Sequence, residues 1–242
     1  MMKAPKPTTI PLRLELEYML DQRRLMRDLS FLTVASLQVR KDSDELLAFI
    51  GLSAPEIFNE TKLRRRLRQI ANRMTDEKLQ ELARLLGRSV QPPFPGLINQ
   101  WIDGQVLAIQ ATIEAWLTTA SEEILRSRIK GMAFADMTVA IRERAKNVGF
   151  VAEQRASAAI LQLNSALIEE IAKSGGSTHY RWTTMNDDRV RTNHRALHFK
   201  IQSWNDPPLG GGTKPGDVGH PGSGYGCRCL AIPLQGPPLV GG

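Results

Sequence analysis

A single stripe of apolar side chains constrains the fold of this chain more than any other feature of its sequence. Its members recur every three or four positions and are Ile98, Ile102, Val106, Ile109, Ile113, Trp116, Ala120 and Ile124. This is the spacing of one face of an α-helix, so the sequence predicts a helix over Leu97–Lys130. At roughly 1.5 Å per residue, such a helix is about 50 Å long. A helix of that length with one apolar face must pack along a partner, in this chain or in a neighbouring one.

The residues before this helix also have helical patterns. Leu12–Gln38 is rich in Leu, Met, Arg and Glu, which are good helix formers. The stretch Ser53–Glu56 has the composition of a capping box and predicts a helix start with Ser53 as the N-cap. The apolar stripe of that helix consists of Leu63, Leu67, Ile70 and Met74. Thr75 is then predicted to cap a further short helix that ends at Gly87.

Glycines divide the rest of the helical part. Gly131 and Gly149 are predicted to bound one helix, and Phe150–Lys173 is predicted to form another. This second helix ends at Gly175 and Gly176, because glycine adopts the left-handed conformation that often ends a helix.

After Gly176 the pattern changes to short strand-like runs between turns. Residues 177–242 contain more than half of the glycines and half of the prolines of the chain. Strands are predicted at His179–Thr184, Phe199–Trp204 and Cys227–Pro233. A short helix is predicted from Asp188 to about Leu197, with Asn186 or Asp187 as its cap.

The predicted fold class is therefore α+β. A mainly helical N-terminal body, which contains the long amphipathic helix, precedes a small, loop-rich α+β module. The predicted division is a flexible tail at residues 1–11, the helical body at 12–149, the module at 150–233 and a C-terminal tail at 234–242.

The charge of the chain favours anionic partners. The formal net charge is +7, which favours association with nucleic acid, a membrane surface or an acidic protein surface. No stretch approaches the roughly 20 apolar residues of a membrane helix. The N-terminus has no apolar run after its lysines, so we expect neither a signal peptide nor a membrane partner.

Basic side chains gather beside the stripe that contains Leu63 and Met74. They are Lys62, Arg64, Arg65, Arg66, Arg68 and Arg73. One interpretation is a contact face for DNA phosphates or for an acidic protein surface. The other is a solvated helix face, which is what runs of charge on helices usually form.

The only two cysteines, Cys227 and Cys229, lie two residues apart on a predicted strand. Side chains at this spacing point to the same side of a strand, so both thiols can bind one soft metal ion such as zinc. His194, His198 or His220 can complete the ligand set. A disulfide is disfavoured, because the small ring strains its geometry. The alternative is two small buried thiols without a metal.

A second polar cluster surrounds the predicted short helix. His194 and His198 are four residues apart, which is a known spacing of metal ligands on helices. No acidic residue of the kind found in metalloprotease motifs lies between them. Asp187 or Asp188, paired with a nearby arginine, explains the cluster equally well as a group of structural salt bridges.

These C-terminal blocks, taken together, resemble a known family. They run in the order Tyr180–Trp182, Asp187–Arg191, His194–Leu197, Trp204–Pro208, His220–Gly222 and Cys227–Cys229. The pattern covers about residues 150–233 and resembles the phage Mu F-type head-morphogenesis proteins, which are minor capsid proteins of tailed bacteriophages. The positions that match its motif are Trp182, Asp187, Asp188, Arg189, Arg191, His194, Pro221, Gly222, Cys227, Arg228 and Cys229.

One position departs from the family pattern. Similar proteins commonly have a His-x-x-Leu-x-Gly arrangement, whereas this chain has phenylalanine, Phe199, five residues after His194. The turn at this point must therefore be made differently.

The resemblance implies a structural, non-enzymatic protein of the virion. Such proteins enter the procapsid in few copies, associate with the portal protein and have been linked to packaged DNA. It further implies a place inside the capsid near the portal vertex, after assembly in the host cytoplasm. The major capsid protein is a further expected partner, and no small-molecule substrate is expected.

Two other functions compete with this one. The first is a metal-dependent nuclease, in which His194 acts with Asp187 or Asp188 and the cysteines hold the metal. The second is a DNA-binding protein without a role in the capsid.

Overall fold

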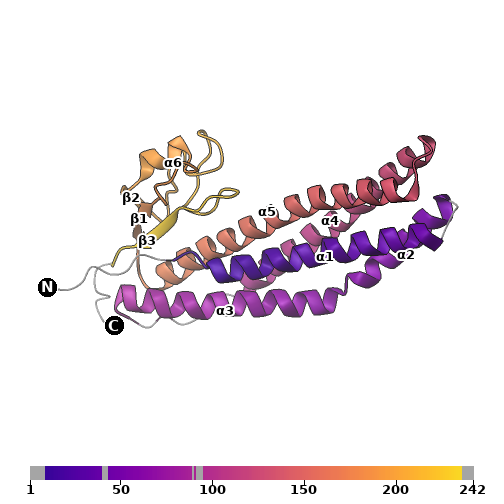
Figure 1. The fold of residues 1–242 in the computed structure, drawn as a ribbon. Helices are drawn as coiled ribbons and strands as arrows, with labels where there is room; N and C mark the ends of the chain where they lie inside the picture. Colours follow the sequence, from indigo (N-terminus) through magenta and orange to yellow (C-terminus); the bar gives the residue numbers. More distant parts are fainter. Residues whose placement is uncertain (1–8, 40–42, 89, 91–94, 236–242) are drawn as a thin grey trace. The chain divides into compact units, whose positions relative to one another are not determined.

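A computed structural model gives the fold and describes residues 9–39, 43–88, 90 and 95–235. Its helices are α1 (Leu12–Val39), α2 (Ser43–Ile57), α3 (Glu60–Leu86), α4 (Pro95–Ile129), α5 (Phe134–Ser174) and α6 (Thr192–Leu197). Its strands are β1 (His179–Thr183), β2 (Ile201–Ser203) and β3 (Leu230–Pro233). Long helices followed by a small antiparallel sheet (Figure 1) confirm the predicted α+β class. Within the described residues, no helix has the length and apolar character needed to cross a membrane.

The chain forms two compact units, and α1, α3, α4 and α5 contribute residues to both. The first unit comprises Met1–Glu15, Gln69–Asn99 and Ser157–Gly242, and the second comprises Leu16–Arg68 and Gln100–Ala156. The division predicted at residue 150 lies inside α5. Most of the two predicted tails, residues 1–8 and 236–242, falls outside the described residues.

The long apolar stripe lies on one helix, α4, as predicted. All of its side chains are buried, and Trp116 is completely enclosed. In the second unit, the Trp116 indole donates a hydrogen bond of 3.3 Å to the Thr33 hydroxyl on α1. The partner that covers this part of the stripe therefore belongs to the same chain.

The predicted helix starts at Ser53 and Thr75 are wrong. Ser53 lies within α2, and Asn59 begins α3 instead, because its side-chain oxygen accepts the Lys62 N–H at 2.9 Å. Thr75 lies inside α3, where its hydroxyl donates to the Ala71 carbonyl at 2.8 Å. A threonine can make this bond in a helix interior as readily as it can cap a helix, so local sequence does not separate the two cases.

The predicted helix break at Gly149 is also wrong. One helix, α5, runs through this position from Phe134 to Ser174. A single glycine costs a helix interior only about 1 kcal/mol, and in the second unit Gly149 packs against the Met26 side chain. Tertiary packing therefore keeps the helix continuous. It ends where predicted, with Gly176 at φ 74°.

The sheet has the order β2-β1-β3, and both neighbours are antiparallel to the central strand. Tyr180 and Trp182, two residues apart on β1, are fully buried, whereas His179 and Arg181 are exposed. This alternation gives the sheet one aromatic face. The candidate site of the module lies against that face.

The helix predicted from Asp188 begins later, at Thr192. Asn186 adopts a positive φ of 54°, and the Asp187 carboxylate accepts the Arg189 N–H at 3.2 Å, so these residues form a turn. The strand predicted from Cys227 also begins later, at Leu230, and both cysteines lie in the segment directly before it.

The turn between α6 and β2 contains a phenylalanine in the left-handed region. Phe199 has a φ of 64°, and its ring lies 3.8 Å from that of His198, measured between centroids. This is the position at which the resembled proteins have glycine. The chain thus places a phenylalanine in a backbone conformation that glycine tolerates best.

We expect Phe199→Gly to be more stable than Phe199→Ala by about 0.5–1 kcal/mol. The left-handed conformation costs a non-glycine residue about 1–2 kcal/mol, and the larger backbone entropy that glycine loses on folding offsets part of this gain. Both variants lose the ring contact with His198, so the difference in stability between them reports on the backbone conformation at residue 199. Thermal unfolding measures it, and equal melting temperatures would contradict the prediction.

Candidate metal centre

Three side chains that can bind a metal meet in the first unit. His194 Nδ1 lies 3.4 Å from Cys227 Sγ and 3.5 Å from Cys229 Sγ. The three ligand atoms all lie within 4.8 Å of one another. His194 is only 1% exposed, and both cysteines are buried and free of disulfides. We call these three residues the His–Cys–Cys cluster.

The sequence spacing explains why both thiols face the same side, but not how the histidine reaches them. Cys227 and Cys229 are two residues apart, and both thiols face His194, as expected for alternate residues of an extended segment. Arg228, between them, instead places its Nη2 atom 2.8 and 2.5 Å from the two carboxylate oxygens of Asp187. The histidine comes from α6, which the tertiary fold brings to the cysteines.

Backbone groups hold the cluster in place. The second ring nitrogen of His194, Nε2, lies 2.8 Å from the Gly212 carbonyl oxygen. In the neutral tautomer that donates a hydrogen bond there, Nδ1, which faces the cysteines, carries no proton. The Gly222 N–H donates to Cys227 Sγ at 3.4 Å. The contact of Gly212 with His194 is not among the predictions from the sequence, and the run Gly210–Gly212 is the signal that could have indicated it.

The three side chains also change each other's proton affinity. The hydrogen bond from Cys229 lowers the pKa of Cys227 against the effect of burial, and His194 lowers it further. The hydrogen bond to Cys227, together with burial, raises the pKa of Cys229. Burial alone lowers the pKa of His194, but its hydrogen bonds to Cys227 and Gly212 outweigh this and raise it. The cluster therefore favours one thiolate, the form of cysteine that binds metals.

The predicted ligand His220 is not part of the cluster. Its Nδ1 lies 2.9 Å from the Tyr180 hydroxyl, and its ring packs edge-on against Tyr180. His194 packs in the same way against Trp182, the next inward residue of β1. The two histidines therefore occupy successive positions along the strand, which keeps His220 away from the thiols.

His198, the other alternative, also faces elsewhere. It lies just beyond the end of α6, and its Nδ1 accepts the backbone N–H of Thr184 at 3.1 Å. The spacing of four residues between His194 and His198 therefore does not place both on one helix face.

The space beside the cluster is small. A recess of about 20 Å³ is lined by His194, both cysteines, Met185, Arg189, Val190, Arg191, Gly226 and Arg228. A water molecule needs about 10–15 Å³ measured in this way. The recess therefore has room for an ion or a water molecule, and not for a nucleotide.

Comparison with known proteins finds a family model that matches this module and the helical residues directly before it. Residues 118–232 match the family model described as Phage Mu protein F like protein. This match supports the assignment of that part of the chain to the phage Mu F-like family. An uncharacterised protein from Haemophilus influenzae is 25% identical over 147 residues, which is 59% of this chain and 30% of that protein. The chain thus spans less than a third of that relative's length. No solved structure matches the chain.

Within the Mu F-like region, the predicted polar motif forms a network of contacts to its loops. Besides the pair between Asp187 and Arg228, the Arg191 guanidinium donates to the Tyr225 carbonyl at 2.6 Å. Arg189 lies 3.8 Å from Asp187, and Asp188 is exposed. These contacts join the turn before α6 to the segment that carries the cysteines, as expected for a structural role.

The C-terminal part of α5 also contacts this segment in the first unit. The Ser165 hydroxyl donates to the Pro221 carbonyl, and Gln162 donates to the Ser223 carbonyl at 3.3 Å. Gly222, with φ 84°, lies so close that an added Cβ would be 2.8 Å from the Ser165 Cβ. The helix predicted to precede the module is therefore packed against it.

We expect Asp187→Asn to weaken the acid dependence of stability. The hydrogen bond from Arg228 lowers the pKa of Asp187 against the opposing effect of burial. A lowered pKa contributes stability that is present above the ordinary value of 3.8 and is lost as pH falls through the folded value. The wild-type melting temperature should therefore fall more steeply between about pH 5 and pH 3 than that of the variant.

The matched control is Asp188→Asn, which removes the neighbouring exposed carboxylate. This control should keep the wild-type slope of melting temperature against pH. The same slope in all three proteins would contradict a stabilising role for the Asp187–Arg228 pair.

We expect Gly211→Ala to destabilise the module by at least about 2 kcal/mol. An added Cβ would lie 1.9 Å from the Gly219 carbonyl oxygen, and that contact is with backbone. The resulting shift would also move Gly212, whose carbonyl contacts His194.

Gly216→Ala is the control, because no atom lies within 4 Å of a Cβ added there. Chemical denaturation of both variants measures the difference. Equal stabilities would show that the two glycine segments do not approach each other as described.

Proposed function

We propose that this protein is a minor head protein of a tailed bacteriophage that docks on the portal protein. The observation that carries the proposal is the match of residues 118–232 to the phage Mu F-like family. The protein would assemble in the host cytoplasm and lie inside the capsid near the portal vertex. Packaged DNA and the major capsid protein would then be its neighbours.

The chemistry of the module supports a structural role over a nuclease. The His–Cys–Cys cluster is buried, and the recess beside it holds about 20 Å³. The Asp187 carboxylate is paired with Arg228 and does not contact His194, so the two are not arranged as a catalytic pair. A phosphodiester cannot reach the cluster without a rearrangement of the surrounding loops.

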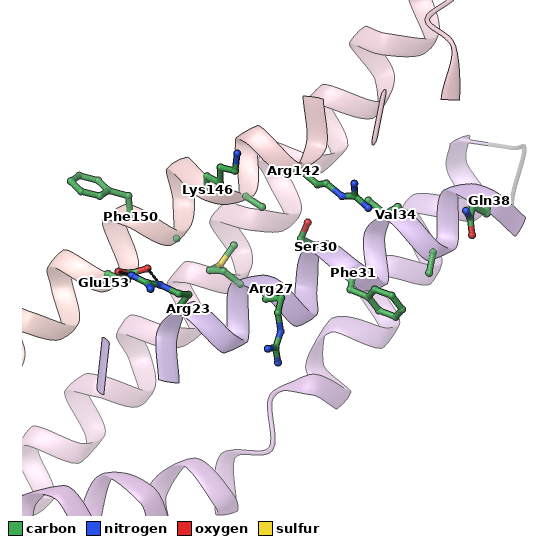
Figure 2. A pocket seen from close by; sticks show the side chains of 14 residues that line it. Arg23, Arg27, Ser30, Phe31, Val34, Gln38, Arg142, Lys146, Phe150 and Glu153 are labelled. Atoms are coloured by element: carbon green, nitrogen blue, oxygen red, sulfur yellow. Dashed lines mark hydrogen bonds and ion pairs between the residues drawn. The ribbon is translucent and has the colours of Figure 1, made fainter. Parts of the chain in front are cut away.

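A groove in the second unit offers a docking surface. It has a volume of about 820 Å³ and lies between α1 and α5. Figure 2 shows Arg23 of α1 and Glu153 of α5 joined across it, with nitrogen and oxygen 2.8 Å apart. Phe31 and Phe150, at 75% and 64% exposed, are among its lining side chains. Exposed aromatic side chains of this kind are typical anchors of protein–protein interfaces.

The charge of the groove favours an acidic partner. Its apolar lining side chains include Met26, Phe31, Val34, Ala35, Ala145 and Phe150. Its charged ones are four basic residues, Arg23, Arg27, Arg142 and Lys146, and the carboxylate of Glu153. Arg23, Arg27 and Lys146 are paired with Glu153, Asp28 and Glu143, so the positive charge that Arg142 adds is the part that favours an acidic partner. An amphipathic helix with acidic flanks matches this combination. We propose that such a helix of the portal protein is the occupant.

The basic face predicted on α3 is less suited to bind DNA than its sequence indicates. In the second unit, Arg64 pairs with Glu60 and Asp103, and Arg66 pairs with Glu17 and Asp21. These carboxylates offset the charges of Arg64 and Arg66. The pairs support the interpretation as a solvated face, and contact with DNA through Lys62, Arg65, Arg68 or Arg73 stays a prediction.

A binding assay between this protein and the purified portal protein of the same phage tests the proposal. The wild type should bind, and Phe31→Glu combined with Arg142→Glu should weaken binding at least about tenfold, which is about 1.4 kcal/mol. Both changed residues are exposed, so the fold should be retained. Biosensor titration at physiological salt measures the affinities.

The matched control combines Leu107→Glu with Arg155→Glu, which changes one exposed apolar residue and one exposed arginine outside the groove. It should bind like the wild type. Equal loss in both double variants would contradict docking through the groove, and a wild type that does not bind would overturn the proposed partner.

A further inference from the structure

We propose that His194, Cys227 and Cys229 bind one zinc ion, which cross-links the loops of the C-terminal module. This inference concerns the stability of the module and does not depend on docking to the portal. The ion would be held by one imidazole nitrogen and two thiolates, and both cysteine protons would be released to solvent on binding.

The distances match those across a zinc ion. A zinc–nitrogen bond of about 2.0–2.1 Å and a zinc–sulfur bond of about 2.3 Å, meeting at the tetrahedral angle, separate nitrogen and sulfur by about 3.5–3.6 Å. His194 Nδ1 lies 3.4 and 3.5 Å from the two sulfur atoms. The nitrogen thus already lies at the distance from each sulfur that a shared zinc ion requires, and the two sulfur atoms lie within 4.8 Å of each other.

The surroundings of the ligands match a metal site as well. A histidine that binds a metal usually donates its other ring N–H to a carbonyl or carboxylate, which fixes the ring and its tautomer. The contact between His194 Nε2 and the Gly212 carbonyl has this geometry. The Gly222 N–H donates to Cys227 Sγ, which stabilises a thiolate.

Trp182 provides an independent indication. Its indole Nε1 is buried and has no hydrogen-bond partner among the described residues. The indole ring packs edge-on against the imidazole of His194, with 5.3 Å between the ring centroids, and therefore lies beside the cluster. A buried donor costs less when it faces a negatively charged acceptor, so a metal-bound Cys229 thiolate accounts for a group that the apo arrangement leaves unsatisfied.

The fourth position of the ion is assigned to water. Among the described residues, no other histidine, cysteine or carboxylate joins the cluster. The recess of about 20 Å³ adjoins all three ligands and has the size of one water molecule. A softer divalent ion such as zinc is favoured over magnesium or calcium, because two of the ligands are sulfur.

A metal would supply stability that this module otherwise lacks. Between Ser203 and Leu230 the described chain contains no helix or strand longer than an isolated bridge. An ion bound by His194 of α6 and by the two cysteines before β3 would hold together the segments on either side of these loops. Zinc sites contribute directly to the folding free energy of such small domains.

The test begins with the full-length wild-type protein, produced without a polyhistidine tag. Elemental analysis after dialysis should find about one zinc ion per chain. Cobalt substituted for the zinc should give thiolate-to-metal charge transfer and the visible bands of tetrahedral coordination. A strong chelator should lower the melting temperature of the wild type and leave that of Cys227→Ser/Cys229→Ser unchanged.

Variants identify the ligands. His194→Ala should lose the zinc, whereas His220→Asn, which removes the other histidine predicted from the sequence, should retain it. A wild-type protein that holds no zinc after reconstitution with zinc sulfate would overturn the proposal, even if every variant failed to fold. Zinc retained by His194→Ala would overturn it as well, and neither result would bear on binding to the portal protein.

Discussion

The imidazole of His194 joins three parts of the C-terminal module that are distant in sequence. One nitrogen contacts the Gly212 carbonyl, and the other faces the thiols of Cys227 and Cys229. The ring itself packs against Trp182 on the central strand. Helix α6, the glycine-rich loop and the segment before β3 therefore depend on the position of one side chain. Because that side chain is buried, loss of any of these contacts leaves a polar group without a partner, which typically costs 1–3 kcal/mol.

Close approaches between backbone segments and ion pairs hold the loops around this cluster. Gly211 lies directly against Gly219, and Arg228 holds Asp187 across the module. Phe199 adopts a conformation that suits glycine. The surrounding contacts must outweigh this local cost, as the ring contact with His198 and the bond from Phe199 N–H to the Trp182 carbonyl do in part.

The helical part follows different rules. Its long helices depend on buried apolar faces, and local signals that normally end or begin a helix are overridden. Gly149 and Thr75 both lie inside continuous helices, because a glycine or a threonine weakens a helix by less than the burial of the flanking apolar face stabilises it. The groove between α1 and α5 has no counterpart in the sequence pattern, since its residues come from two helices separated by more than a hundred positions.

The sequence by itself determined that the N-terminal part is mainly helical, that the long apolar stripe lies on one helix, that a helix ends at Gly175 and Gly176, and that the two thiols share a side. These properties depend on local periodicity, on glycine at helix ends and on a spacing of two residues, all of which act over a few neighbours. Only the tertiary structure decided that His194 and not His220 meets the thiols, because that choice depends on which inward position of β1 each histidine faces. It also decided that α5 is continuous and that Asn59 begins α3, since packing between distant segments outweighs the small free energies of local signals.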